Sequence, residues 1–107
     1  MRYLIGYDIA DDRRRDRVAT TLLDFGQRLE ESLFPVYAET PRYEELLARL
    51  ATLAAGAPLD RIHVVPICHA CWGKAVIFGD GQLPNEAEFL HSLMNFATVA
   101  VSLAVSH

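Results

Sequence analysis

The chain opens with a hydrophobic run placed directly before a dense cluster of charge. Residues 2–9 read RYLIGYDI, a short run rich in β-branched and aromatic side chains that fits a buried β-strand. Residues 10–17 then read ADDRRRDR. Asp11 or Asp12 can cap a helix there, because a carboxylate accepts hydrogen bonds from the free N–H groups of a first helical turn. We therefore predict a strand, an acidic turn and a helix whose start carries arginines.

The next segments continue the pattern of short periodic elements. The first helix is expected to extend to about Phe25, and Gly26 to end it by adopting a left-handed conformation. Residues 28–34 alternate between polar and apolar side chains, which predicts a second strand. Pro35 would interrupt that strand, and residues 36–38 would form a short returning strand.

A second helix and two further strands complete the predicted domain. Thr40 is the expected cap of this helix, and Pro41 its first residue, where the missing N–H of proline costs nothing. Residues 61–67 and 73–78 predict strands. The resulting order is βαββαβ plus one strand, which predicts an α+β sandwich with two helices on one face of a mainly antiparallel sheet.

This domain would comprise residues 1–83, and residues 84–107 would form a C-terminal extension. Within the extension, residues 86–96 predict a helix and residues 98–106 alternate as a strand does. We expect the extension to clasp a partner subunit, because an exposed apolar strand is prone to aggregate. The apolar stretch 89–105 is too short and too polar to predict a membrane span.

Composition limits the class of protein further. The 107 residues predict one domain, and without a signal-peptide pattern we expect a cytoplasmic protein. The net charge of −4 argues against a non-specific nucleic-acid binder, which is usually basic. However, six of the ten basic residues precede residue 30, which leaves room for a local basic surface.

Asp8 is a candidate metal ligand at the end of the first predicted strand. Burying an ionised carboxylate is costly without a partner, so one interpretation is a helix cap or an ion pair with Arg15 or Arg17. The other interpretation is a Mg²⁺ site. One carboxylate is a poor Mg²⁺ site, because the ion prefers octahedral oxygen ligation. A two-fold dimer with Asp8 near its axis would supply two carboxylates.

The arginines at the helix start are candidate phosphate ligands. Arg13, Arg14 and Arg17 would lie mainly on the outer side of the helix, whereas Arg15 would extend its buried stripe. Cations at this end oppose the helix dipole, so a nearby anion such as phosphate would stabilise them. A solvated charged face, with each arginine paired to a neighbouring aspartate, is the alternative.

Cys68 and Cys71 form a single Cys-x-x-Cys pair. A convincing zinc site needs a second pair of ligands, and the candidates nearby are His63 and His69. A redox pair is expected just before a helix, whereas here a predicted strand precedes it and Gly73 follows. We therefore expect a plain turn, with zinc binding and redox chemistry as open alternatives.

Three segments together resemble the CRISPR-associated protein 2 family, the small subunit of spacer acquisition. They are YLIGYDIADDRRRDRVA, FGQRLEESLF and DRIHVVPICHAC, and the likeness spans residues 2–79. The resemblance implies a ferredoxin-like fold, a homodimer and metal-dependent nuclease activity on RNA or DNA. It also implies a role as a bridge between copies of the partner integrase, the first CRISPR-associated protein, on the duplex to be inserted.

The resemblance also assigns roles to individual residues. Asp8 matches the metal-binding, catalytic aspartate of the family, and Mg²⁺ is the expected cofactor, although other divalent metals can substitute. Glu30 stands where the family has glutamine, and its negative charge would weaken the grip on phosphate. The remaining basic and polar matches are expected to contact nucleic acid: Arg15, Arg17, Arg28 and Ser32. The aromatic match, Phe34, is expected to pack in the core or at the dimer interface.

Three functions are compatible with this pattern. The first is a CRISPR adaptation subunit with Mg²⁺-dependent endonuclease activity, in which two Asp8 carboxylates hold the metal across the dimer axis. The second is a non-catalytic dimer that binds DNA and bridges the integrase subunits. The third is a toxin-like ribonuclease that works without partners.

Overall fold

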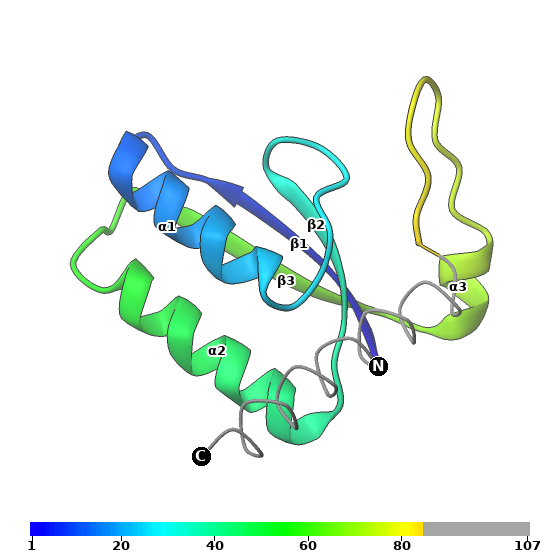
Figure 1. The fold of residues 1–107 in the computed structure, drawn as a ribbon, viewed down its shortest axis with the longest axis horizontal. Coiled ribbons are helices and arrows are strands. Elements are labelled where there is room, and N and C mark those ends of the chain that lie inside the picture. The colour runs from blue at the N-terminus through cyan, green and yellow to red at the C-terminus, as the bar shows by residue number, and fades with distance from the viewer. Residues whose placement is uncertain (85–107) are drawn as a thin grey trace, which may run out of the picture.

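The computed structural model describes residues 1–84, in which strands and helices alternate along the chain (Figure 1). The three strands form one antiparallel sheet in the order β2-β1-β3, so β1 is central. Helices α1 and α2 lie side by side on one face of this sheet (Figure 1). The elements are β1 (Arg2–Asp8), α1 (Asp12–Leu23), β2 (Leu33–Tyr37), α2 (Thr40–Ala54), β3 (Arg61–Ile67) and α3 (His69–Gly73).

The predicted α+β class is confirmed, but the predicted βαββαβ order is wrong in two places. A single strand, β2, replaces the two strands predicted for residues 28–34 and 36–38. Pro35 lies inside β2 opposite Leu4, and proline is tolerated there because β2 is an edge strand of the sheet. The strand predicted for residues 73–78 is absent from the described chain, where α3 ends at Gly73 and an irregular segment follows.

The expectations for the C-terminal extension concern residues outside the described part of the chain. The helix predicted for residues 86–96 and the clasping strand predicted for residues 98–106 therefore stay predictions, as does the boundary at residue 83. Within residues 1–84, no helix is both long and apolar enough to cross a membrane.

The core forms between the sheet and the two long helices. Every second side chain of β1 points to the helices, because successive residues of a strand face opposite sides. Helix α1 adds Val18, Ala19 and Leu22 to this core, as their helical spacing predicts. The same spacing also predicts a buried Leu23, and this is wrong, because Leu23 is 53% exposed. The residues of the core are Tyr3, Ile5, Tyr7, Ile9, Val18, Ala19, Leu22, Phe25, Phe34, Val36, Ala38, Leu46 and Leu50.

The ends of the helices follow the predictions only in part. The carboxylate of Asp11 caps α1 by accepting the backbone N–H of Arg14 at 2.8 Å. The cap of α2 is Glu39 rather than Thr40, and its side chain makes no capping hydrogen bond. Gly26 does not have a positive φ, so the predicted left-handed conformation is wrong. Glycine is needed there for space, since a Cβ atom would lie 2.3 Å from the carbonyl oxygen of Pro35.

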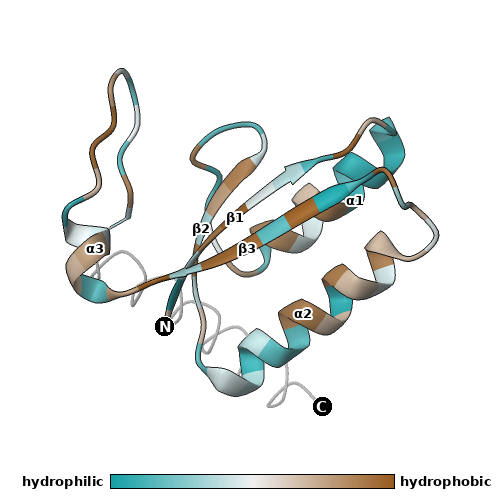
Figure 2. Ribbon diagram, turned by 180° about the vertical axis from the view of Figure 1, so that it is seen from behind, coloured by the Kyte–Doolittle hydropathy of each residue, from teal (hydrophilic) through white to brown (hydrophobic). Residues whose placement is uncertain are grey.

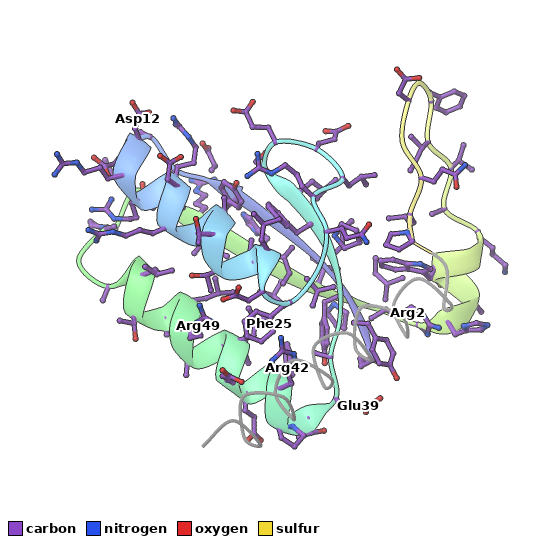
Figure 3. All side chains as sticks on the ribbon, in the orientation of Figure 1. Arg2, Asp12, Phe25, Glu39, Arg42 and Arg49 are labelled. Carbon is purple, nitrogen blue, oxygen red and sulfur yellow. The ribbon has the colours of Figure 1, made fainter. Side chains whose placement is uncertain are left out.

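Two arginines of α2 hold the end of α1. Their guanidinium groups lie over the ring of Phe25, with the centroid 4.3 Å from Arg42 and 5.4 Å from Arg49 (Figure 3). Arg42 also donates to the backbone carbonyl of Asp24 at 2.5 Å, and Arg49 forms an ion pair with its carboxylate at 2.9 Å. These contacts attach the C-terminal end of α1 to α2.

The face of the sheet turned away from α1 and α2 carries an apolar stripe with a polar end. Figure 2 views the molecule from this side, and β3 crosses it with alternating hydrophilic and hydrophobic residues. The β1 side chains on this face are those that alternate with the core residues, among them Leu4 and Asp8. Val65 lies opposite Leu4 on β3 and is 49% exposed. Leu4 is half-buried, so Val65 is the exposed part of this stripe.

Candidate nucleic-acid and metal site

A shallow pocket forms where β1 ends, and Asp8 lies in it. The pocket has a volume of about 250 Å³. It brings Asp8 from β1 together with Arg15 from α1 and Ser32 from the turn before β2, although these residues are far apart in the sequence. The three were predicted as metal and nucleic-acid ligands, and the structure places them at one site. The full lining is Tyr7, Asp8, Ile9, Arg15, Glu31 and Ser32.

Asp8 is exposed, and it is not neutralised by a neighbouring cation. Among residues 1–84, no side chain forms an ion pair or a hydrogen bond with its carboxylate, so the interpretation of Asp8 as an ion-pair partner of Arg15 or Arg17 is wrong for this part of the chain. Asp8 is the last residue of β1, and successive side chains of a strand point to opposite faces of the sheet. Because Tyr7 points to the core, Asp8 points to the opposite side. The carboxylate is thus available to a ligand from outside the chain.

Tyr7 attaches the turn that carries Ser32 to β1. Its hydroxyl donates to the backbone carbonyl of Glu31 at 2.8 Å, and its backbone N–H donates to the carbonyl of Ser32 at 3.2 Å. Burial raises the pKa of the Tyr7 phenol, and the positive charge of Arg28 partly opposes this rise. The sequence predicted no role for Tyr7 at this site. A tyrosine predicted to be buried needs a partner for its hydroxyl, and that need was the available signal.

Arg15 is held at the edge of the pocket by its own segment. One guanidinium nitrogen donates to the carbonyl of Ile9 at 3.2 Å, and another pairs with the carboxylate of Asp12. For this residue, the predicted pairing with a neighbouring aspartate is therefore confirmed. The side chain is 37% exposed, so it still presents charge to the pocket.

The other arginines of α1 divide into one structural residue and two free cations. Arg14 is not on the outer side of the helix, as predicted, but forms an ion pair with Asp60 at 2.6 Å. The Asp60 side chain is only 8% exposed, so this pair ties α1 to the loop before β3. Arg13 and Arg17 are exposed, and neither has an ion-pair or hydrogen-bond partner for its side chain within the described residues.

Arg28 and Phe34 lie close together, although their predicted roles differ. The guanidinium group of Arg28 is 5.4 Å from the centre of the Phe34 ring, and Arg28 itself is exposed. Phe34 is fully buried inside its own chain. Its expected structural role is therefore that of a core residue, and it offers no surface to a base or to a partner subunit.

Arg61 is a cation near this site that the sequence did not single out. Arg61 on β3 lies directly opposite Asp8 on β1, and its side chain is exposed. Side chains of directly opposed residues lie on the same face of a sheet, with their Cβ atoms about 5 Å apart. The sequence carried no signal for this proximity, because 52 residues separate the two positions and only the strand register brings them together.

The residues of one chain make an incomplete set of metal ligands. In the part of the chain that the structure describes, no three side chains among His, Cys, Asp and Glu gather around a common point. Asp8 alone is a weak ligand set for Mg²⁺, which binds one or two carboxylates together with waters and substrate phosphates. A second carboxylate from another chain would give a Mg²⁺ ion two protein ligands instead of one.

Known proteins of similar sequence and fold support one family. The family described as CRISPR associated protein Cas2 matches residues 1–75. A protein of Chloroflexus aurantiacus named CRISPR-associated endoribonuclease Cas2 is 36% identical over 91 residues, which are 85% of this chain and 98% of that protein.

Two solved structures show the same fold. A hypothetical protein from Thermus thermophilus has a TM-score of 0.68 and 31% identity, over 78% of this chain and 96% of that one. A chain of a partial Cas6-RT-Cas1–Cas2 complex has a TM-score of 0.50 and 25% identity, over 59% of this chain and 76% of that one. Because the family match includes the strand that ends at Asp8 and every other strand of the sheet, the chain belongs to the CRISPR-associated protein Cas2 family.

Proposed function

We propose that this protein is a metal-dependent endonuclease subunit of CRISPR adaptation, which hydrolyses phosphodiester bonds of RNA or DNA. The observation that carries this function is the exposed carboxylate of Asp8, which has no ion-pair partner among residues 1–84 and lies in a pocket edged by Arg15 and Ser32. The name of the Chloroflexus relative, an endoribonuclease, supports the same activity.

Some residues of the pocket would bind the metal ion, and others would bind the phosphate. Asp8 would hold Mg²⁺ or another divalent ion, which when bound acidifies a coordinated water and neutralises charge on phosphoryl oxygens. Arg15 and Ser32 would orient the scissile phosphate, with its oxygens facing the guanidinium and hydroxyl groups. Arg13, Arg17 and Arg28 would contact neighbouring phosphates, whereas Arg14 would not, because it is bound to Asp60.

The active form would be a homodimer of ferredoxin-like sandwiches joined through the open face of the sheet. This face carries Asp8 at one end and the exposed Val65 along its apolar stripe. Covering the stripe with a second copy removes apolar surface from water, which stabilises association by about 25 cal/mol per Å². A two-fold axis near the end of β1 would bring a second Asp8 carboxylate to the site.

The partner in the cell would be the CRISPR-associated integrase. A chain of similar fold is part of the Cas6-RT-Cas1–Cas2 complex described above. The acidic net charge of −4 means that the grip on nucleic acid would come from the local group of arginines, doubled in the dimer. Co-expression with the integrase of the same operon, followed by size-exclusion chromatography, tests this partner directly.

Cleavage by matched carboxylate variants tests the activity. Single-stranded RNA and duplex DNA are incubated with the wild-type protein, with Asp8→Asn and with Asp80→Asn, each in Mg²⁺ and in EDTA. Asp80 is an exposed aspartate outside the pocket, so its substitution controls for loss of one negative charge. We expect Asp8→Asn in Mg²⁺ to fall to the level of the wild type in EDTA, and Asp80→Asn to cleave normally.

Two results would contradict this assignment. Full activity of Asp8→Asn would place cleavage at another site or in a contaminating nuclease. Binding of both substrates by the wild-type protein without any cleavage would support the non-catalytic bridging dimer instead.

A further inference from the structure

Two thiols lie next to each other at the end of β3, and the nuclease site does not use them. Cys68 follows the last residue of β3, Cys71 lies in α3, and both are exposed. Arg61, beside Asp8, is at the other end of the same strand, about 20 Å away at the usual rise of a strand. The thiols are therefore too far from the pocket to take part in its chemistry.

The local backbone was expected to be a plain turn, but it is a short helix that begins at the cysteines. Cys68 is the N-cap of α3, and its Sγ accepts the backbone N–H of Cys71 at 3.4 Å. The carbonyl of Cys68 accepts the N–H of Trp72 at 2.9 Å, which closes the turn. The sequence argument against redox chemistry was that a strand precedes the pair and Gly73 follows it. The structure keeps both features, since β3 ends before Cys68 and α3 ends at Gly73, but it adds one short helix that begins at the pair.

The hydrogen bonds make the two thiols chemically different. The backbone N–H and the thiol of Cys71 both bind the Cys68 sulfur, which lowers the pKa of Cys68. The same contact raises the pKa of Cys71, because its thiol proton is engaged by Cys68 and a second negative charge nearby is unfavourable. A thiolate is the nucleophile in thiol–disulfide exchange, so the pair has an attacking and a resolving member.

A structural zinc site is a poorer explanation of the same pair. His69 lies between the cysteines in the sequence, yet within residues 1–84 no third His, Cys, Asp or Glu joins the two thiols. Two exposed ligands do not close a tetrahedral site, which needs four.

We propose that Cys68 and Cys71 are a redox-active dithiol that small-molecule disulfides, such as oxidised glutathione, convert to an intramolecular disulfide. The Cys68 thiolate attacks one sulfur of the disulfide, forms a mixed disulfide and expels one thiolate. Cys71 then loses its proton to that thiolate or to solvent, attacks the Cys68 sulfur and expels the second. The two electrons of the dithiol reduce the small disulfide to two thiols, which take up the two protons.

Trp72 makes the state of the pair visible. It is the single tryptophan of the chain, it follows Cys71 directly, and it is buried. Its indole N–H donates to the carbonyl of Pro84 at 3.1 Å. The helix that carries the cysteines is therefore also bound to the end of the segment of residues 74–84. Closing the disulfide would change this turn and therefore the fluorescence of Trp72.

Equilibration of the full-length protein in glutathione buffers of stepped redox potential tests the dithiol. We expect a reversible change of Trp72 fluorescence that follows the Nernst equation for two electrons, with loss of two hydrogens by mass spectrometry. Cys71→Ser should instead accumulate one glutathione on residue 68, since the resolving thiol is gone. In reduced protein at pH 7, iodoacetamide should label Cys68 several-fold faster than Cys71.

Other results would overturn the assignment. Stable glutathione adducts on both cysteines of the wild type would show that the two thiols react independently, and would contradict the proposal. Disulfides that form only between two chains would do the same. Cys68→Ser and Cys71→Ser should both retain the circular dichroism of the wild type, because the two side chains are exposed, and nuclease activity of the reduced protein is not involved in any of these readouts.

Discussion

Asp8 and Arg61 face each other across the β1–β3 ladder, and they make no ion pair with each other. An opposed carboxylate and guanidinium would ordinarily be expected to bind one another. Here both side chains are exposed and free for other partners within the described part of the chain. A metal-bound phosphate could be held between them, with the metal on Asp8 and a phosphate oxygen on Arg61. In the proposed function, Arg61 would thus be a phosphate ligand on β3 in addition to the arginines of α1.

Substituting Arg61 should weaken nucleic-acid binding without unfolding the protein. Removal of one phosphate contact lowers the slope of log K against log salt by about 1. We therefore expect Arg61→Gln to bind duplex DNA more weakly than wild type at low salt, with this shallower slope. Lys74→Gln removes one exposed charge outside the pocket and is the matched control. Equal slopes for Arg61→Gln and Lys74→Gln, measured by fluorescence anisotropy, would remove Arg61 from the site.

Arg14 and Arg17 should separate stability from binding. Arg14→Gln leaves the buried carboxylate of Asp60 without its partner, so the free energy of unfolding should fall by about 1–3 kcal/mol. Arg17→Gln should change it by less than about 0.5 kcal/mol, because Arg17 is exposed and unpaired among residues 1–84. Arg17→Gln should nonetheless weaken nucleic-acid binding. Urea titrations and binding at one salt concentration distinguish the two roles, and a stable Arg14→Gln protein would show that the ion pair adds nothing.

A charge placed on the open sheet face should break the dimer. Val65→Glu introduces a carboxylate on the apolar stripe, and we expect a monomer in sedimentation velocity together with loss of cleavage. Leu23→Glu is the control, since Leu23 is similarly exposed but lies on α1. Because both positions are about half exposed, neither variant should unfold. Dissociation by Leu23→Glu rather than Val65→Glu would move the interface to the helical side of the molecule.

Tyr7 should make the protein sensitive to alkaline pH. Burial raises the pKa of its phenol in the folded protein above the ordinary value of about 10. Above that value the unfolded chain loses the proton while the folded chain keeps it. The contribution of Tyr7 to stability is therefore constant below about pH 10 and falls as the pH rises further, by at most about 1.4 kcal/mol per pH unit for one group.

Comparison with Tyr7→Phe isolates this effect. The variant loses the hydrogen bond to the Glu31 carbonyl, so its stability at pH 7 should be lower by about 1 kcal/mol. The stability of the variant should decline less steeply above pH 10 than that of the wild type. Some decline remains in both proteins, because burial also raises the pKa of Tyr3. Parallel declines in denaturant titrations from pH 8 to pH 11 would show that Tyr7 is not the group responsible.

The sequence by itself determined the elements whose pattern depends on near neighbours. The apolar run of residues 2–8 forms β1, Asp11 caps α1, and the helical spacing of Val18, Ala19 and Leu22 marks the buried side of α1. It also placed Asp8 at the end of β1. Alternation, capping and helical spacing are properties of a few consecutive residues, so they can be read without knowing the rest of the fold.

Only the tertiary structure decided which distant groups meet. The strand register placed Arg61 opposite Asp8, and packing of α1 on the loop before β3 turned Arg14 into a partner of Asp60. Gly26 is required by the approach of Pro35 rather than by its own backbone angles. Such contacts depend on the positions of whole elements, which are set by burial of the common core, and no local pattern around either residue encodes them.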